Sequence, residues 1–133
     1  MADMGLYTGK TNAPSEKVIR FKFFVDAGNQ PTVPTNPFNF GIASIVWVSQ
    51  GLYRITMQHA YKGHFETSAQ LNVSAAGQQR FAQPGPVANV GTATAATVDI
   101  LVVDNAGAVQ NPAAANANNF ISGHITFIDV STV

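Results

Sequence analysis

The chain has 133 residues, no cysteine, and seven basic and seven acidic side chains, so that only 11% of its residues are charged. A net charge near zero argues against binding bare nucleic acid or an anionic membrane surface through bulk electrostatics. The lack of cysteine excludes a disulfide scaffold and a Cys-ligated zinc site, and no apolar stretch approaches the roughly 20 residues of a membrane span. The length fits one domain, which buries enough surface to hold a core without cross-links.

Charged side chains are unevenly distributed along the chain. Residues 27–53 and 81–98 contain none, and no Lys or Arg follows Arg80. Because the cores of protein interfaces are depleted in charge, this pattern indicates surfaces that other proteins cover. The alternative is a monomer whose solubility rests on Asn, Gln, Ser and Thr.

The N-terminal part differs from the rest of the chain. Residues 1–16 show no helical or strand period, and Leu6 and Tyr7 are their only sizeable apolar side chains. We therefore predict an extended N-terminal arm, disordered alone or ordered by a partner, followed by one β domain over residues 17–133. The arm lacks a basic region followed by an apolar stretch, so we expect no signal peptide.

In the first half of the domain, the alternation of apolar and polar side chains predicts β-strands. Residues 18–25 alternate apolar and polar side chains, as do residues 52–58. Between them, the prolines of residues 31–37 predict an extended connecting loop. Residues 42–49 form the most apolar run of the chain and predict a strand buried on both faces.

The second half continues this pattern with weaker signals. We expect a strand over residues 64–74 in which Phe65 and every second residue after it share one face. Further strands are expected over residues 92–103 and 120–130, with a loop at 75–82, a chain break at Pro84-Gly-Pro86 and a short edge strand at 87–90. About seven or eight strands result, with all prolines in loops or the arm. The fold class is all-β, an antiparallel sandwich or jelly roll.

No catalytic or metal-binding motif is present. The spacing of His59, His64 and His124 matches no zinc-ligand pattern, so we predict no metal and no cofactor. Glu66 and Asp99 are the strand carboxylates that could take part in acid–base chemistry, but facing solvent is the ordinary case for both. An enzyme on a jelly roll remains an alternative without a supporting motif.

A carbohydrate-binding β-sandwich is a further alternative, because such modules use exposed aromatic side chains. Trp47, Tyr53 and Tyr61 are the candidates. Trp47 lies in the apolar run, which favours a core position for it.

A resemblance to a known class of proteins adds to this interpretation. Four segments carry it: residues 51–61, which begin Gly51-Leu-Tyr-Arg-Ile-Thr56, the weakly alternating residues 64–74, the apolar strand and turn of residues 95–107, and the alternating residues 124–129. These features resemble small virion proteins of tailed bacteriophages that decorate or cement the capsid, and more broadly C1q-like or TNF-like jelly rolls. The resemblance implies a jelly-roll domain, often trimeric, at capsid three-fold positions, with an arm across neighbouring capsid subunits.

The resulting hypothesis is a non-enzymatic virion structural protein on the capsid exterior, assembled in the host cytoplasm. Its expected partners are the major capsid protein and further copies of itself in a homotrimer, with no nucleic acid, membrane or cofactor. A tail, fibre or head-fibre protein is the alternative within the virion. The expected contact residues are Leu6, Tyr7 and Lys10 in the arm, and Phe38 and Phe40 at a subunit interface.

Overall fold

The computed structural model describes residues 16–25, 30–34, 39–73, 80–112 and 119–128, and these residues form eight β-strands. The strands are β1 (Glu16–Val25), β2 (Pro31–Thr32), β3 (Ile42–Ser49), β4 (Leu52–Met57), β5 (Gly63–Asn72), β6 (Arg80–Ala88), β7 (Thr97–Asp104) and β8 (Phe120–Ile128). No helix occurs among the described residues, and none of them therefore forms a helix that could cross a membrane.

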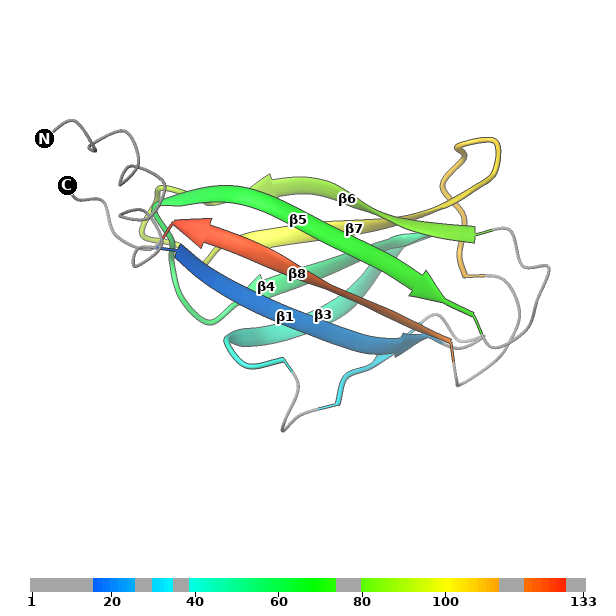
Figure 1. Cartoon of the computed structure of the whole chain (residues 1–133), viewed down its shortest axis with the longest axis horizontal. Coiled ribbons are helices and arrows are strands. Elements are labelled where there is room, and N and C mark those ends of the chain that lie inside the picture. The colour runs from blue at the N-terminus through cyan, green and yellow to red at the C-terminus, as the bar shows by residue number, and fades with distance from the viewer. Residues whose placement is uncertain (1–15, 26–29, 35–38, 74–79, 113–118, 129–133) are drawn as a thin grey trace, which may run out of the picture.

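The strands pair into two antiparallel sheets of four strands that pack face to face (Figure 1). Sheet I has the order β2-β1-β8-β5, and sheet II has the order β3-β4-β7-β6. The predicted all-β sandwich with seven or eight strands is confirmed. The first strand begins at Glu16, and the preceding residues of the predicted arm lie outside the described part of the chain.

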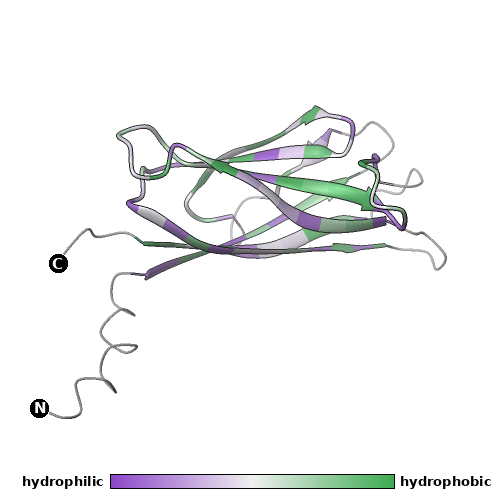
Figure 2. Ribbon diagram, turned by 90° about the horizontal axis from the view of Figure 1, so that it is seen from above, coloured by the Kyte–Doolittle hydropathy of each residue, from purple (hydrophilic) through white to green (hydrophobic). Residues whose placement is uncertain are grey.

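The core lies between the sheets and is built from alternate residues of each strand, so hydropathy changes from residue to residue along the ribbons (Figure 2). Phe23 of sheet I and Tyr53 of sheet II are both fully buried, with ring centroids 5.2 Å apart. Tyr61 stacks on Phe127 at 4.3 Å. These aromatic contacts join the sheets through the apolar area that they remove from water.

Strand β6 contradicts the expectation that Pro84 and Pro86 break the chain. It runs from Arg80 to Ala88 through both prolines, with a register shift between Pro84 and Val87 where it pairs with β7. An edge strand tolerates proline because the backbone groups on its outer side form no ladder hydrogen bonds. At a bulge, one residue is left unpaired, so the N–H that proline lacks is not needed there. The assignment of all prolines to loops was therefore wrong.

The strand predicted from residue 92 begins five residues later, at Thr97. Asn89 and Gly91 have positive φ angles of 64° and 79°, and the Thr92 hydroxyl donates to the Asn89 carbonyl at 2.9 Å. This local hydrogen bonding competes with strand pairing and holds the segment in a turn.

Two predicted burial patterns were also wrong. Strand β3 lies at an edge of sheet II instead of being buried on both faces, and its Val46 and Val48 side chains are 45% and 41% exposed. In β5, a register shift between His64 and Glu66 turns Phe65 outward, so that it is 65% exposed. Period-two arguments fail at bulges because the extra residue reverses the faces.

The turn after β7 depends on one carboxylate. Asp104 Oδ1 accepts hydrogen bonds from the backbone N–H of Ala108 at 3.0 Å and of Ala106 at 2.9 Å. The hydrogen bond from Ala108, and to a smaller extent that from Ala106, lowers the pKa of Asp104 below its ordinary value of 3.8. Because the folded-state pKa is depressed, the stabilisation is present above the unfolded-state pKa and is lost as the pH falls through the folded-state pKa.

Asp104→Asn keeps an oxygen acceptor but cannot titrate. We therefore expect the free energy of unfolding of this variant to fall less with decreasing pH than that of the wild type. Urea unfolding between about pH 5 and pH 2 should show a smaller loss of stability in the variant than in the wild type. Identical pH profiles for the two proteins would contradict this role of the carboxylate.

Candidate functional site

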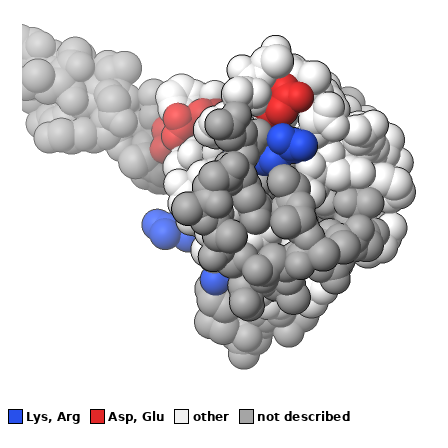
Figure 3. Space-filling view, turned by 90° about the vertical axis from the view of Figure 1, so that its right-hand side faces the viewer, with Lys and Arg blue, Asp and Glu red and all other residues white. Residues whose placement is uncertain are grey.

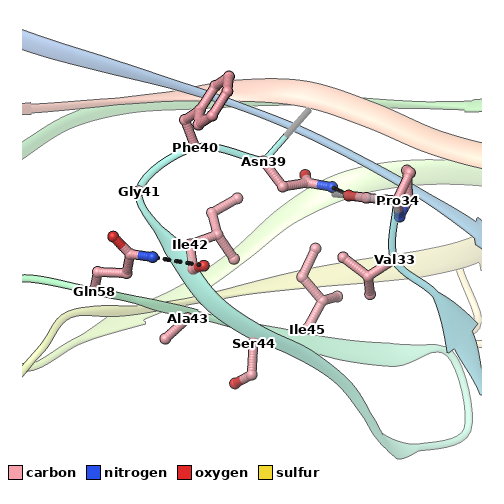
Figure 4. Close-up of a pocket in the computed structure, with 10 residues that line it drawn as sticks. All are labelled: Val33, Pro34, Asn39, Phe40, Gly41, Ile42, Ala43, Ser44, Ile45 and Gln58. Atoms are coloured by element: carbon pink, nitrogen blue, oxygen red, sulfur yellow. Dashed lines mark hydrogen bonds between the residues drawn. The ribbon is translucent and has the colours of Figure 1, made fainter. Parts of the chain in front are cut away.

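An uncharged groove opens beside strand β3, at one lateral side of the sandwich (Figure 4). Its volume is about 550 Å³. The described lining residues come from the segment after β2, the turn before β3, β3 itself and the residue after β4: Val33, Pro34, Asn39, Phe40, Gly41, Ile42, Ala43, Ser44, Ile45 and Gln58. None of these side chains is charged, and in Figure 4 Val33, Ile42 and Ile45 face one another across the opening.

The groove exists because the sandwich closes on one side and not on the other. Strands β5 and β6 pack against each other, whereas β1 and β3 approach each other only briefly. Between β1 and β3, the Asn39 side chain takes the place of a neighbouring strand. Its Oδ1 accepts from the Lys22 N–H at 2.8 Å, and its Nδ2 donates to the carbonyls of Lys22 at 2.8 Å and Pro34 at 2.7 Å.

The backbone at Asn39 supports this arrangement, since its φ of 63° lies in the left-handed region that Asn tolerates better than most residues. The next residue, Phe40, stands at the rim of the groove with 68% of its surface exposed. Of the predicted contact residues, Phe40 is the one that the structure describes. Leu6, Tyr7, Lys10 and Phe38 lie outside the described residues.

The outer face of sheet II carries a second candidate surface, which we call the outer patch: Val46, Leu52, Phe81, Leu101 and Val109, with the buried Val103 (8% exposed) between Phe81 and Val109. Within it, Val46 is 45% exposed, Phe81 55% and Val109 41%. Cross-strand pairing brings these side chains together, because Leu52 is opposite Leu101 and Phe81 is opposite Val103. Apolar side chains gathered on one sheet face are typical of a surface that another molecule covers.

A charge pair lies at the centre of this face. Arg54 of β4 is opposite Asp99 of β7, and its Nε and Nη2 donate to the two carboxylate oxygens at 2.8 and 3.0 Å. The hydrogen bond to Asp99, and then its charge, raise the pKa of Arg54 above its ordinary value. Asp99 is only 5% exposed, so the expectation that it faces solvent was wrong. Among the described residues, Arg54 and Asp99 are the charged side chains at the centre of the outer patch, and they neutralise each other.

The outer face of sheet I mixes charged, polar and apolar side chains, since it also carries Val18 and Phe65, which are 56% and 65% exposed. Arg20, His124 and Ser68 form one cross-strand row. His124 Nε2 lies 3.5 Å from Glu66 Oε1, and the Lys22 ammonium lies 4.3 Å from the centre of the Phe120 ring. Viewed from one end of the molecule, the described charged side chains form small separate groups on a mostly neutral surface (Figure 3). The two outer faces therefore differ in chemistry.

The aromatic residues considered for carbohydrate binding are not displayed on a surface. Tyr53 is fully buried and Tyr61 is 5% exposed. Trp47 is partly buried against the core, and its Nε1 donates to Asn111 Oδ1 at 3.3 Å. The interpretation of Tyr53 and Tyr61 as exposed sugar platforms was wrong.

Residues of the metal-binding and acid–base types do not converge. Across the described ranges, no three His, Cys, Asp or Glu side chains lie close enough together to hold a metal ion. His64 Nε2 is 2.7 Å from the Thr67 hydroxyl, and Glu66 and Asp99 belong to different sheets.

No protein-family model, no curated protein and no solved structure matches the chain.

Sequence reasoning missed two elements of these surfaces. The strand alternation placed Arg54 on the polar face of its strand, but nothing in the sequence indicated that Asp99, 45 residues later, lies opposite it. Asn39 stands in a loop sequence without a motif, and its bond to Lys22 spans 17 residues. An Asn followed by an aromatic residue and Gly41 was a local signal for a left-handed turn, but not for its partner.

Proposed function

We propose that the protein is a non-enzymatic structural protein that binds other proteins through the outer patch of sheet II. In the form suggested by its sequence resemblance, it decorates a bacteriophage capsid from the outside and stabilises it by binding across major capsid protein subunits. The observation that carries the proposal is the outer patch itself, an apolar surface whose central charges are already paired within the chain.

The energetics of the outer patch support binding to a protein surface. Leu52 and Leu101 are partly exposed, and Phe81 is more than half exposed. Covering such side chains gains roughly 25 cal/mol per Å² of apolar area. Arg54 and Asp99 bring no unpaired charge to such a contact, because the guanidinium donates to both oxygens of the carboxylate.

The capsid form of the proposal gives the remaining predicted contacts a role. Leu6, Tyr7 and Lys10 would contact neighbouring capsid subunits, and Phe38 and Phe40 would lie at a subunit interface. Several weak contacts on one repetitive shell raise the effective concentration of each further contact, so that high occupancy needs no single strong site.

The experiment that tests the proposal measures binding to capsid shells assembled from the major capsid protein of the same phage. We expect Phe81→Ser to weaken co-sedimentation with the shells by about tenfold or more, as truncation of a central apolar contact does. Phe65→Ser is the matched control, since Phe65 is similarly exposed but lies on sheet I, and it should bind within about twofold of the wild type. Equal binding by the wild type and Phe81→Ser would contradict the assignment of the outer patch.

A further inference from the structure

The four lateral strands of the sandwich are not protected equally against pairing with another chain. Strand β6 contains Pro84 and Pro86, and β5 has a bulge beside the charged Glu66. Strand β1 is covered by β2 at one end and by the Asn39 side chain further along. Natural proteins use such devices to block edge pairing. Strand β3 (Ile42–Ser49) contains no proline and no charged residue.

The free edge of β3 presents backbone groups over a short regular stretch. In β4, the Met57 N–H donates to the Ala96 carbonyl, on the β7 side of the strand. Successive residues of a strand point their backbone groups alternately to opposite sides, so those of Arg54 point toward Val46 of β3. Because ladder hydrogen bonds alternate, the backbone groups of Ile45 and Trp47 point away from β4. No described strand pairs with that edge. Register shifts on either side limit the regular stretch to residues 44–47.

We propose that a second copy of the chain pairs with this edge, β3 against β3 in antiparallel orientation, about a two-fold axis at Val46. In this register Ile45 of each copy is opposite Trp47 of the other, so the outward-pointing backbone groups meet in hydrogen-bonded pairs. The two Val46 side chains face each other directly, at the separation of about 4.5–5.5 Å between Cβ atoms that is usual for cross-strand pairs.

Chemistry favours a second copy as the occupant. Neither β3 nor the described lining of the groove beside it contains a charged side chain, so two copies meet there without repulsion and without burying an unpaired charge. Val46 also belongs to the outer patch, so that pairing joins the outer patches of the two copies into one continuous sheet face. An interface that uses the same residues on both copies closes at two, which differs from the trimer that the sequence resemblance implies.

Sedimentation velocity of the full chain tests this inference. We expect the wild type to sediment with twice the 14.0 kDa mass of one chain, and Val46→Lys to raise the dissociation constant at least tenfold. Val46 is 45% exposed, so a lysine can be accommodated in the fold. The control Phe65→Lys, which is as accessible but lies on another edge strand, should remain dimeric. A wild-type monomer at about 100 μM, a trimer, or a Val46→Lys dimer of unchanged affinity would overturn the pairing.

Cross-linking provides a second readout that does not depend on how a lysine is tolerated. The chain has no cysteine, so Val46→Cys introduces a single thiol, which should form a disulfide-linked dimer on mild oxidation. The matched variant Phe65→Cys should stay monomeric on a denaturing gel. Equal cross-linking of both variants would contradict the register.

The pairing is independent of the proposed function: a monomer that binds capsids overturns only the pairing, and a dimer that does not bind them overturns only the proposed function.

Discussion

Replacement of Gly123 by alanine is expected to destabilise the protein by about 3 kcal/mol or more. Gly123 lies in the middle of β8, between β1 and β5, and a Cβ atom there would overlap the backbone carbonyl of Ser68 on β5. A flexible side chain could move aside, but this neighbour is the backbone of a paired strand. Relief therefore requires separating β5 from β8, and the cost is a large share of the 5–15 kcal/mol that stabilises typical domains.

Urea denaturation of wild type and variant measures this loss directly. Gly63→Ala is the matched control, because Gly63 also lies on the β5–β8 pair but an added Cβ would make ordinary contacts of 3.4 Å with Ile128. The control should change stability by less than about 1 kcal/mol. A Gly123→Ala protein as stable as Gly63→Ala would show that β5 and β8 are not so closely apposed.

Phe23→Ala is expected to cost about 3–5 kcal/mol, the usual range for removing a fully buried aromatic side chain. Phe23 is 0% exposed and contacts Tyr53 of the opposite sheet, with Phe21 as a further ring neighbour at 6.3 Å. The truncation leaves a cavity at the centre of the sandwich, bounded by side chains of both sheets. Thermal unfolding should show a correspondingly lower midpoint.

The adjacent Phe24→Ala provides the comparison for this prediction. Phe24 points to the outer face of sheet I, where its ring meets Phe120 edge-on at 5.8 Å. We expect it to cost about 1 kcal/mol, since only a partly buried contact is lost. If the two truncations were equally costly, the assignment of Phe23 to the core between the sheets would be contradicted.

Much of the fold was predictable because alternation over a whole strand determines which face is buried. This worked for β1, where Ile19, Phe21 and Phe23 face the core, and for β4, where Tyr53 and Ile55 do. In each case polar residues stand between the apolar ones. The period then follows from the pleat of the strand alone and needs no knowledge of its neighbours.

The predictions failed where neighbouring strands decide the outcome. An apolar run such as residues 42–49 does not distinguish a central strand from an edge strand, because either kind of strand can have an uninterrupted apolar sequence. Phe65 reversed its face at a bulge, which depends on the register with β8. The prolines of β6 are tolerated only because that strand lies at an edge.

The candidate surfaces were still less accessible from the sequence, since they combine residues from distant segments. The charge-free ranges 27–53 and 81–98 supply β3, all of β6 after Arg80, and most of the groove, and the low charge was the one signal that indicated these surfaces. The position of Asp99 opposite Arg54, which leaves the outer patch neutral, follows from the strand order of sheet II. Strand order is not encoded in any local pattern.

An electron cryomicroscopy reconstruction of capsids carrying the bound protein would show directly which face of the sandwich meets the shell. We predict density for the β-sandwich on the outside of the shell, with sheet II toward the capsid and Phe81 and Leu101 buried in the contact. Density on the tail only, or a sandwich that contacts the shell through the outer face of sheet I around Arg20 and His124 with the outer patch open to solvent, would contradict this prediction.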